Sequence, residues 1–281
     1  MQPTGDVAVV IPARNESDRI AATVTAAAGL PGVDIVIVVD DGSDDGTVAA
    51  AEGAGASVVR HARNRGKAAA METGAEAVRL LEASEAYGAR QADGARQANG
   101  AGQADGALQA DGALQANGAT RACPRHLLFL DADLAETAKA AAPLVDPVRA
   151  AAADMTIAVF ASTVKLGGHG FVVRLSRDGI KRATGWDATQ PLNGQRCLTR
   201  AAFQAGLPLA AGFGVETALT IDLLRKGLRV TEVEVPLAHR ATGTDWRAQV
   251  HRAKQFRDVA RALATRDPAL TRGVGRFFRS G

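Results

Sequence analysis

The sequence predicts an α/β protein in which a mostly parallel central sheet is flanked by helices. Short runs rich in Val and Ile alternate with alanine-rich stretches along the first half of the chain, and this alternation is typical of βαβ units. Hydrophobic residues make up 47% of the 281 residues, which is enough for a large buried core. Aromatic residues make up only 4%, so aliphatic side chains and alanine must fill that core.

The first half of the chain is expected to supply four strands, each a short apolar run. They cover residues 6–12, 33–40, 57–60 and 126–131. Helices are predicted between them, where alanine and other helix formers dominate. These helices cover residues 15–29, 47–53 and 66–85. Because helices join the consecutive strands, the connections favour parallel pairing.

Five six-residue units of the form Gly-Ala-x-Gln-Ala-Asp/Asn interrupt this order over residues 88–119. The third position changes from Arg to Gly to Leu, so no apolar stripe persists, and a glycine in every unit weakens a helix. A β-helix would need a bulky apolar residue in each turn. We therefore expect a flexible, low-complexity insertion, with a partner-binding segment as the alternative.

The second half of the chain contains both strand-like and helix-like patterns of apolar residues. Strands are expected over residues 155–160 and 230–235, and helices over residues 171–184 and 214–226. From residue 245 onward, apolar side chains recur every three or four positions, which predicts an amphipathic helix and tail over residues 245–281. This segment is basic, with nine Lys or Arg against three Asp, although the whole chain carries a net charge of only +3. Such a face suits phosphate or anionic lipid, and an ordinary solvated helix face is the alternative.

The sequence argues against several classes of protein. No uncharged apolar stretch reaches the roughly 18–20 residues that span a bilayer, and the first residues do not form a signal peptide. Cys123 and Cys197 fit neither a disulfide framework nor a zinc cluster. No G-x-G-x-x-G motif follows the first strand, so a nicotinamide-dependent enzyme is not favoured. We expect a cytoplasmic protein, and peripheral contact with the inner face of a membrane through the basic tail is left open.

Two carboxylates, Asp131 and Asp133, lie at the end of the predicted fourth strand. Carboxylates at this spacing can hold a divalent cation. Such a cation bridges the phosphates of a nucleotide and offsets the charge that grows on a leaving diphosphate. A solvated turn is the alternative interpretation of this motif.

Polar motifs also follow the second and third predicted strands. Asp40 and Asp41 precede a glycine and a serine, and a carboxylate there can accept a hydrogen bond from a base N–H group. A self-capped, Asp-rich turn is the alternative. Residues 64–67, Asn-Arg-Gly-Lys, place a glycine and Lys67 at a helix N-terminus, which suits a phosphate. A solvent-facing lysine is the alternative there.

In their order, these motifs resemble those of family 2 glycosyltransferases with the GT-A fold, and the resemblance covers residues 6–135. It rests on VVIPARNE at 9–16, VDDGSDDGT at 39–47, NRGK at 64–67 and FLDAD at 129–133. The resemblance implies a GT-A domain over residues 1–244, with Mg²⁺ or Mn²⁺ held by Asp131 and Asp133. It also implies a nucleotide-sugar site lined by Pro12, Ala13, Glu16, Asp40, Asp41, Lys67, Asp131 and Ala132.

The second half of the chain is similar to a neighbouring retaining family, the glucosyl-3-phosphoglycerate synthases. The similar stretches are residues 190–195, 199–200, 212–216 and 239–240. The resemblance implies that the acceptor loop contains Gly194, Gln195 and Arg196, that Glu216 lies beside the reacting centre, and that His239 is a third metal ligand. This chain has Gly-Gln-Arg where the family usually has Gly-Glu-Tyr, and Phe213 where the family has Tyr. Arg196 could still pair with an anionic acceptor.

The expected function is metal-dependent transfer of a sugar from a nucleotide-sugar donor, such as UDP-glucose, to an anionic small-molecule or lipid-phosphate acceptor. Glu216 and Asp133 are the expected catalytic residues. Glu216 would act as a general base in an inverting enzyme and would orient hydroxyl groups in a retaining one. We expect no nucleic-acid partner, and a homodimer is left open.

Three other functions are weighed against this one. They are a polyprenyl-phosphate glycosyltransferase at the membrane surface, a sugar nucleotidyltransferase, and a scaffold built on a decayed transferase. The second is considered because residues 11–14, Ile-Pro-Ala-Arg, also open some cytidylyltransferases. The carboxylates at 131, 133 and 216 argue against the third.

Overall fold

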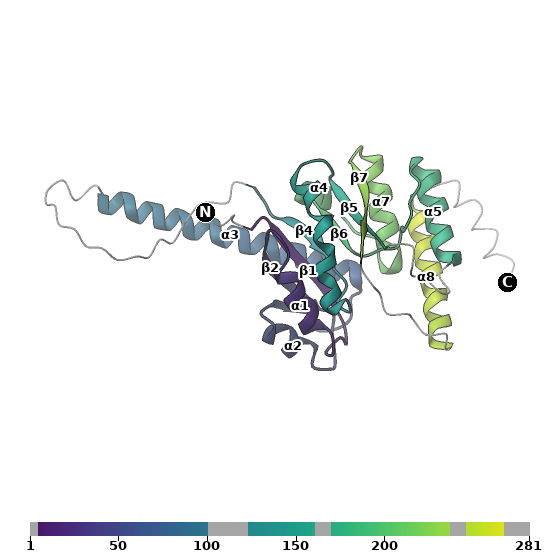
Figure 1. Ribbon diagram of the computed structural model, residues 1–281, viewed down its shortest axis with the longest axis horizontal. Helices are drawn as coiled ribbons and strands as arrows, with labels where there is room; N and C mark the ends of the chain where they lie inside the picture. Colours follow the sequence, from purple (N-terminus) through teal and green to yellow (C-terminus); the bar gives the residue numbers. More distant parts are fainter. Residues whose placement is uncertain (1–4, 101–122, 161–169, 237–245, 267–281) are drawn as a thin grey trace.

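The computed structural model describes residues 5–100, 123–160, 170–236 and 246–266 (Figure 1). Within them, seven strands form one sheet in the order β3-β2-β1-β4-β6-β5-β7. Neighbours pair in parallel except at β6, which is antiparallel to both β4 and β5. The predicted mostly parallel α/β fold is therefore confirmed. The strands are β1 Val7–Ala13, β2 Val33–Asp40, β3 Ser57–Arg60, β4 His126–Phe129, β5 Met155–Phe160, β6 Arg196–Leu198 and β7 Val230–Val235.

Helices cover both faces of this sheet. The α-helices are α1 Ile20–Ala28, α2 Thr47–Gly53, α3 Lys67–Gly100, α4 Asp146–Arg149, α5 Gly170–Thr184, α6 Arg200–Ala205, α7 Val215–Arg225 and α8 Trp246–Ala264. Two 3₁₀ segments, η1 Ala135–Leu144 and η2 Gly212–Gly214, complete the described elements. Among the described helices, none is both long enough and apolar enough to cross a bilayer.

The strand period sorts the core into two layers. Val7, Val9 and Ile11 of β1 face one side, where α1, α2, η1 and α4 pack, whereas Ala8 and Val10 face α3, α6 and α7. This alternation places apolar side chains on both faces, as a sheet covered on both sides requires. A third apolar cluster joins α5 and α8 to α7. Helices α5 and α8 lie at the right of the molecule in Figure 1.

Helix α3 lies directly on the first strand. A Cβ atom at Gly74 would overlap Val10 Cγ1, so only a glycine permits this close approach of helix to sheet. Lys67 is the first residue of α3, so this packing fixes the position of the Lys67 main chain relative to the sheet. The helix continues through Gly100 and extends well beyond the sheet (Figure 1).

The length of α3 corrects the prediction that the whole repeat over residues 88–119 is a flexible insertion. Residues 88–100, two complete six-residue units and the first residue of the third, are helical. Alanine, arginine and glutamine are good helix formers, and they outweigh one glycine in six when a packed helix already leads into the segment. Residues 101–119 lie outside the described residues.

Two smaller predictions also differ from the structure. Helix α1 begins at Ile20 rather than at residue 15, because Asn15 has a positive φ of 56° and its N–H donates to Ser43 Oγ at 2.9 Å. Strand β6 and helix α6 were not predicted. A strand of only three residues is too short to show a period.

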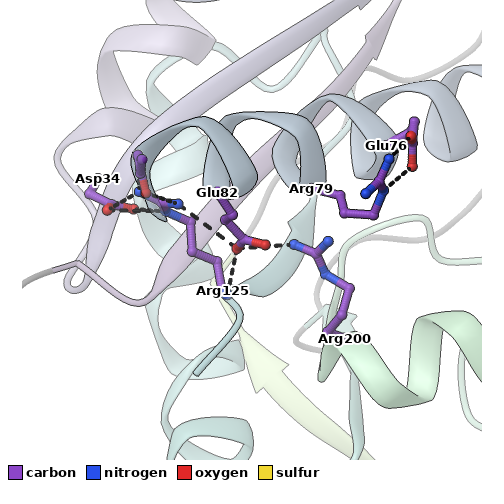
Figure 2. Close-up of polar contacts among 7 residues, drawn as sticks. Asp34, Glu76, Arg79, Glu82, Arg125 and Arg200 are labelled. Carbon is purple, nitrogen blue, oxygen red and sulfur yellow. Dashed lines mark hydrogen bonds and ion pairs between the residues drawn. The ribbon is translucent and has the colours of Figure 1, made fainter. Parts of the chain in front are cut away.

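An ion-pair network ties α3 to the sheet on the side away from Lys67. The guanidinium of Arg125, just before β4, contacts Asp34 of β2 at 2.8 Å and Glu85 of α3 at 2.8 Å. Arg200 of α6 contacts Glu82 of α3 at 3.3 Å, and Figure 2 shows Glu82 lying between the two arginines. Burial alone would lower the pKa of Arg125, but the hydrogen bonds that it donates to Asp34 and Glu85 raise that pKa above its ordinary value. The network therefore joins β2, α3 and α6 to the segment just before β4.

Candidate active site

The loops after β1, β2 and β4 meet at one edge of the sheet. These three strands are neighbours and parallel, so their carboxyl ends lie together. The main-chain N–H of Asp41 donates to the carbonyl of Ala13 at 2.8 Å, which joins the first two loops. Pro12 and Ala13 end β1, and Glu16 follows in the same loop, where its N–H donates to Thr47 Oγ1 at 2.9 Å. In open α/β sheets, ligands bind at this edge.

Asp40 and Asp41 are both buried and bind other parts of the chain. Asp41 accepts hydrogen bonds from the N–H groups of Arg65 and Gly66, both at 2.7 Å, and lies 2.8 Å from His61 Nδ1. Burial would raise the pKa of Asp41, but these hydrogen bonds hold it below its ordinary value, so the group is a carboxylate. Asp40 pairs with Arg60 at 3.2 Å.

Asp41 and Gly42 together shape the loop that leads into α3. Gly42 has a φ of +74°, and a Cβ there would lie 2.8 Å from the main chain of Arg63 and Asn64. Only glycine combines this backbone conformation with such a close approach. The loop over residues 63–66 is therefore held against the end of β2, and Lys67 follows it directly.

Lys67 lies between two carboxylates that are far apart in the sequence. Its Nζ atom is 2.7 Å from Asp131 Oδ1 and 3.0 Å from Glu216 Oε1. Burial alone would lower the pKa of Lys67, but the charges of Asp131 and Glu216 raise it above its ordinary value. The structure therefore brings together three of the predicted site residues, from α3, the end of β4 and α7.

The predicted acceptor loop lies against the same aspartate. Gln195 is fully buried, and its Nε2 donates to Asp131 Oδ2 at 2.7 Å. Asn193 holds Gln195 in place by accepting its main-chain N–H at 2.9 Å. A Cβ at Gly194 would overlap Lys67 Nζ, so the absence of a side chain makes room for the ammonium group. The hydrogen bond between Gln195 and Asp131 had no signal in the sequence.

Arg196 lies in the predicted loop, but it is not available to an acceptor. It is fully buried, and its guanidinium donates to the carbonyl oxygens of Pro191, Asn193 and Glu216 at 2.8–3.1 Å. Burial lowers its pKa to about 10. The expectation that Arg196 pairs with an anionic acceptor is corrected accordingly, since its side chain instead holds the loop against α7.

Asp133 and Ala132 complete the motif after β4. The carbonyl of Ala132 accepts from Thr23 Oγ1 at 2.8 Å, and that of Asp133 accepts from Arg19 at 3.0 Å, so α1 fixes the main chain of the motif. The side chain of Asp133 is half-buried. Within the described ranges, its carboxylate has neither a hydrogen bond nor an ion pair.

The donor set at this edge fits a divalent cation. Asp131 and Asp133 supply carboxylate oxygens, the ligands that Mg²⁺ and Mn²⁺ prefer, and the ammonium of Lys67 already lies against Asp131. In the part of the chain that the structure describes, no group of three acidic, His or Cys side chains surrounds one point. His239, the predicted third ligand, lies outside the described residues.

One known family model matches the part of the chain that contains β1, β2, β3 and the start of α3. Residues 8–80 match the family model "Glycosyl transferase family 2", and none of the curated proteins searched matches the chain. The family model covers only the first part of the chain, and the chain shares the GT-A fold of the similar solved structures.

Several of the similar solved structures are of glucosyl-3-phosphoglycerate synthase from Mycobacterium tuberculosis. The complex of that enzyme with Mg²⁺ and UDP matches with a TM-score of 0.64 and 22% identity, over 92% of this chain and 78% of that one. Its complex with Mn²⁺, UDP and phosphoglyceric acid matches with a TM-score of 0.62 and 24% identity, over 92% and 78%. Its complex with Mn²⁺, UDP-glucose and phosphoglyceric acid matches with a TM-score of 0.59 and 23% identity, over 92% and 79%. At these identities the likeness establishes the shared fold.

Proposed function

We propose that this chain is a metal-dependent glycosyltransferase that moves a sugar from a UDP-sugar, such as UDP-glucose, to an anionic acceptor. The observation that carries the proposal is the meeting of Lys67, Asp131 and Glu216 at the carboxyl edge of the sheet, with Nζ-to-oxygen distances of 2.7 and 3.0 Å. The similar structures crystallised with UDP, UDP-glucose, Mg²⁺ or Mn²⁺ support the choice of donor and metal.

In this proposal, Asp131 and Asp133 hold the divalent cation. The cation, when bound, supplies positive charge against the diphosphate that leaves the sugar. Lys67 adds a second positive charge at the N-terminal end of α3, where main-chain N–H groups also favour phosphate oxygens. Asp41 keeps the loop before Lys67 in place, and Asp40 accepts from the N–H of Ser43, so the two aspartates act on the nucleotide subsite through the main chain of two loops.

Glu216 is the group that we assign to the acceptor side. It is buried at the start of α7, and η2 with its two glycines precedes it directly. During transfer, the bond from the anomeric carbon to the diphosphate breaks, a bond to the acceptor oxygen forms, and the acceptor hydroxyl loses its proton. In an inverting enzyme Glu216 takes that proton, and in a retaining enzyme it orients the hydroxyl groups.

The acceptor is proposed to be a small phosphorylated acid. The support is the presence of phosphoglyceric acid, and in a further structure glycerol 3-phosphate, in the similar complexes. Gly194 and Gln195 lie beside Asp131 and so border the same space. Because the guanidinium of Arg196 is committed to main-chain carbonyls, another cation must bind the acceptor phosphate.

A lipid-phosphate acceptor at a membrane surface is the second candidate. Phe171 of α5 is 69% exposed and stacks on Phe256 of α8 at 5.4 Å between ring centres, next to exposed cations such as Arg174 and Arg257. Exposed aromatic and basic side chains together suit an anionic lipid surface. Flotation with phosphatidylglycerol vesicles, with Phe171→Ser as the variant, tests this candidate. Light scattering on the same samples shows whether Phe171 instead supports a homodimer.

The test of the proposed function is a thermal-shift panel. UDP-, GDP- and TDP-glucose are compared with and without Mn²⁺, for the wild-type chain and for Asp133→Ala. A ligand that binds only the folded state raises the melting temperature. We expect UDP-glucose with Mn²⁺ to give the largest rise and Asp133→Ala to remove the metal-dependent part. If no nucleotide sugar stabilises the chain, or if Asp133→Ala responds like the wild type, the proposal is wrong.

A further inference from the structure

Both oxygens of Asp131 are engaged in the ligand-free chain. Lys67 Nζ lies 2.7 Å from Oδ1, and the amide of Gln195 donates to Oδ2 at 2.7 Å. The two partners differ in exposure. Gln195 is fully buried and held by Asn193, whereas the Lys67 side chain is 31% exposed and ends a long stem with several rotatable bonds. Any cation that binds Asp131 therefore competes first with Lys67 for Oδ1.

The ammonium group of Lys67 also holds a second carboxylate. Glu216 lies 3.0 Å from the same Nζ, and its side chain is only 9% exposed. Without a positive charge nearby, Asp131 and Glu216 would face each other across the space that Nζ now fills, and partly buried like charges repel. In the ligand-free chain, Lys67 supplies the positive charge that this pair of carboxylates needs.

The neighbouring loop is shaped to admit this ammonium group. A side chain at Gly194 would overlap Lys67 Nζ and would come within 2.9 Å of Asp131 Oδ1. Gly194 has no positive φ, so its backbone conformation does not require a glycine. A glycine is therefore needed at position 194 because the ammonium group of Lys67 occupies the space where a Cβ atom would lie.

We propose that Lys67 is a placeholder cation, meaning that its ammonium group occupies Asp131 until a nucleotide diphosphate draws it away and frees Oδ1 for the divalent metal. This inference rests on the proposed function, and it deepens it by giving an order to binding. The diphosphate offers Lys67 an alternative anionic partner, so metal and nucleotide bind cooperatively. Metal alone must displace Lys67 without that compensation and so binds weakly. Lys67 is thus a positioning residue for the metal ligand Asp131.

Two variants remove the placeholder by different means. Lys67→Met deletes the charge and keeps the length of the side chain. Gly194→Ala leaves every charge in place. Its Cβ would overlap Lys67 Nζ and would lie 2.9 Å from Asp131 Oδ1, so the end of Lys67 must move farther than the carboxylate does. Matched controls are Lys181→Met, an exposed lysine paired with Asp187, and Gly53→Ala, where a Cβ would meet nothing within 4 Å. Circular dichroism checks that each variant folds.

The experiment measures Mn²⁺ binding by electron paramagnetic resonance, with and without UDP, and needs no turnover. In the wild type we expect weak binding of Mn²⁺ alone and much tighter binding with UDP. In Lys67→Met and Gly194→Ala, Mn²⁺ alone should bind about three- to tenfold tighter, the scale of one partly exposed ion pair, and the enhancement by UDP should shrink. Both controls should match the wild type.

The outcomes separate this inference from the proposed function. If the wild type binds Mn²⁺ with UDP, but both variants bind Mn²⁺ alone no more tightly than the wild type, then Lys67 is an ordinary ion-pair partner and the inference is overturned. If only one variant fails to fold, the other decides. If the wild type binds no Mn²⁺ even with UDP, the proposed function fails as well, and the inference fails with it.

Discussion

Replacing Arg125 should destabilise the fold more than replacing any exposed arginine. The change Arg125→Met removes a guanidinium that is only 4% exposed and that contacts Asp34, Glu82 and Glu85. Removing one partner of a fully buried ion pair costs about 3–5 kcal/mol, because the other charge stays buried and unpaired. Here the Asp34 and Glu85 side chains are 25% and 49% exposed, so water partly replaces the lost partner. We therefore expect a loss of about 2–3 kcal/mol in the free energy of unfolding.

Urea denaturation and thermal melting measure this loss. For a domain of this size, about 2–4 °C of melting temperature corresponds to 1 kcal/mol, so Arg125→Met should melt about 5–10 °C below the wild type. The control is Arg229→Met, whose 54% exposed side chain pairs with Asp154, and it should change stability by less than about 1 kcal/mol. Equal, small effects of the two substitutions would refute the view that the network in Figure 2 holds α3 on the sheet.

The remaining predictions concern the site and the repeat. Glu216→Gln should lower turnover roughly a hundredfold or more with donor affinity nearly unchanged, and normal turnover would remove Glu216 from the reaction. His239→Ala should weaken metal-dependent UDP-glucose binding, and calorimetry that finds an unchanged metal requirement would contradict that role. Deleting residues 89–118 should leave the melting temperature nearly unchanged and donor turnover within a few-fold of the parent, since the part of α3 that is removed extends beyond the sheet (Figure 1). A collapse of folding would show that the repeat is structural. The pKa of Asp41 is lower in the folded chain, so its stabilising effect is present above the ordinary value of 3.8 and is lost as the pH falls through the lower, folded value. The melting-temperature difference between wild type and Asp41→Asn should therefore shrink below about pH 4, and a difference that grows there would contradict this assignment.

The strands were the most predictable part of the fold. The runs over residues 33–40, 57–60, 155–160 and 230–235 are strands with those bounds, because β-branched residues make a strong local signal. Strand β6 escaped prediction because its three residues pair with β4 and β5 only through tertiary contact. The glycines of the repeat do not predict the helical continuation of α3, because their local penalty is offset by the packed helix that precedes them.

The site was predictable in its residue types but not in its contacts. The family resemblance placed Lys67, Asp131 and Glu216 in one site. In the structure, Lys67 Nζ lies within 3.0 Å of a carboxylate oxygen of both Asp131 and Glu216. No sequence pattern showed that Gln195 binds Asp131. Nor did any pattern show that Arg196 turns inward, because the direction of a side chain on a short strand depends on how that strand pairs.

The most direct test of metal-dependent glycosyl transfer is the detection of its products. The wild-type chain is incubated with UDP-glucose, Mn²⁺ and 3-phosphoglycerate, and mass spectrometry follows both the release of UDP and the acceptor. We expect release of UDP that requires the metal, is lost in Asp133→Ala, and is accompanied by an acceptor one hexosyl unit heavier. Release of UDP without a glycosylated acid would leave the donor site in place and reject this acceptor. If folded wild-type chain releases no UDP with any acceptor or metal, the central claim of metal-dependent glycosyl transfer is contradicted.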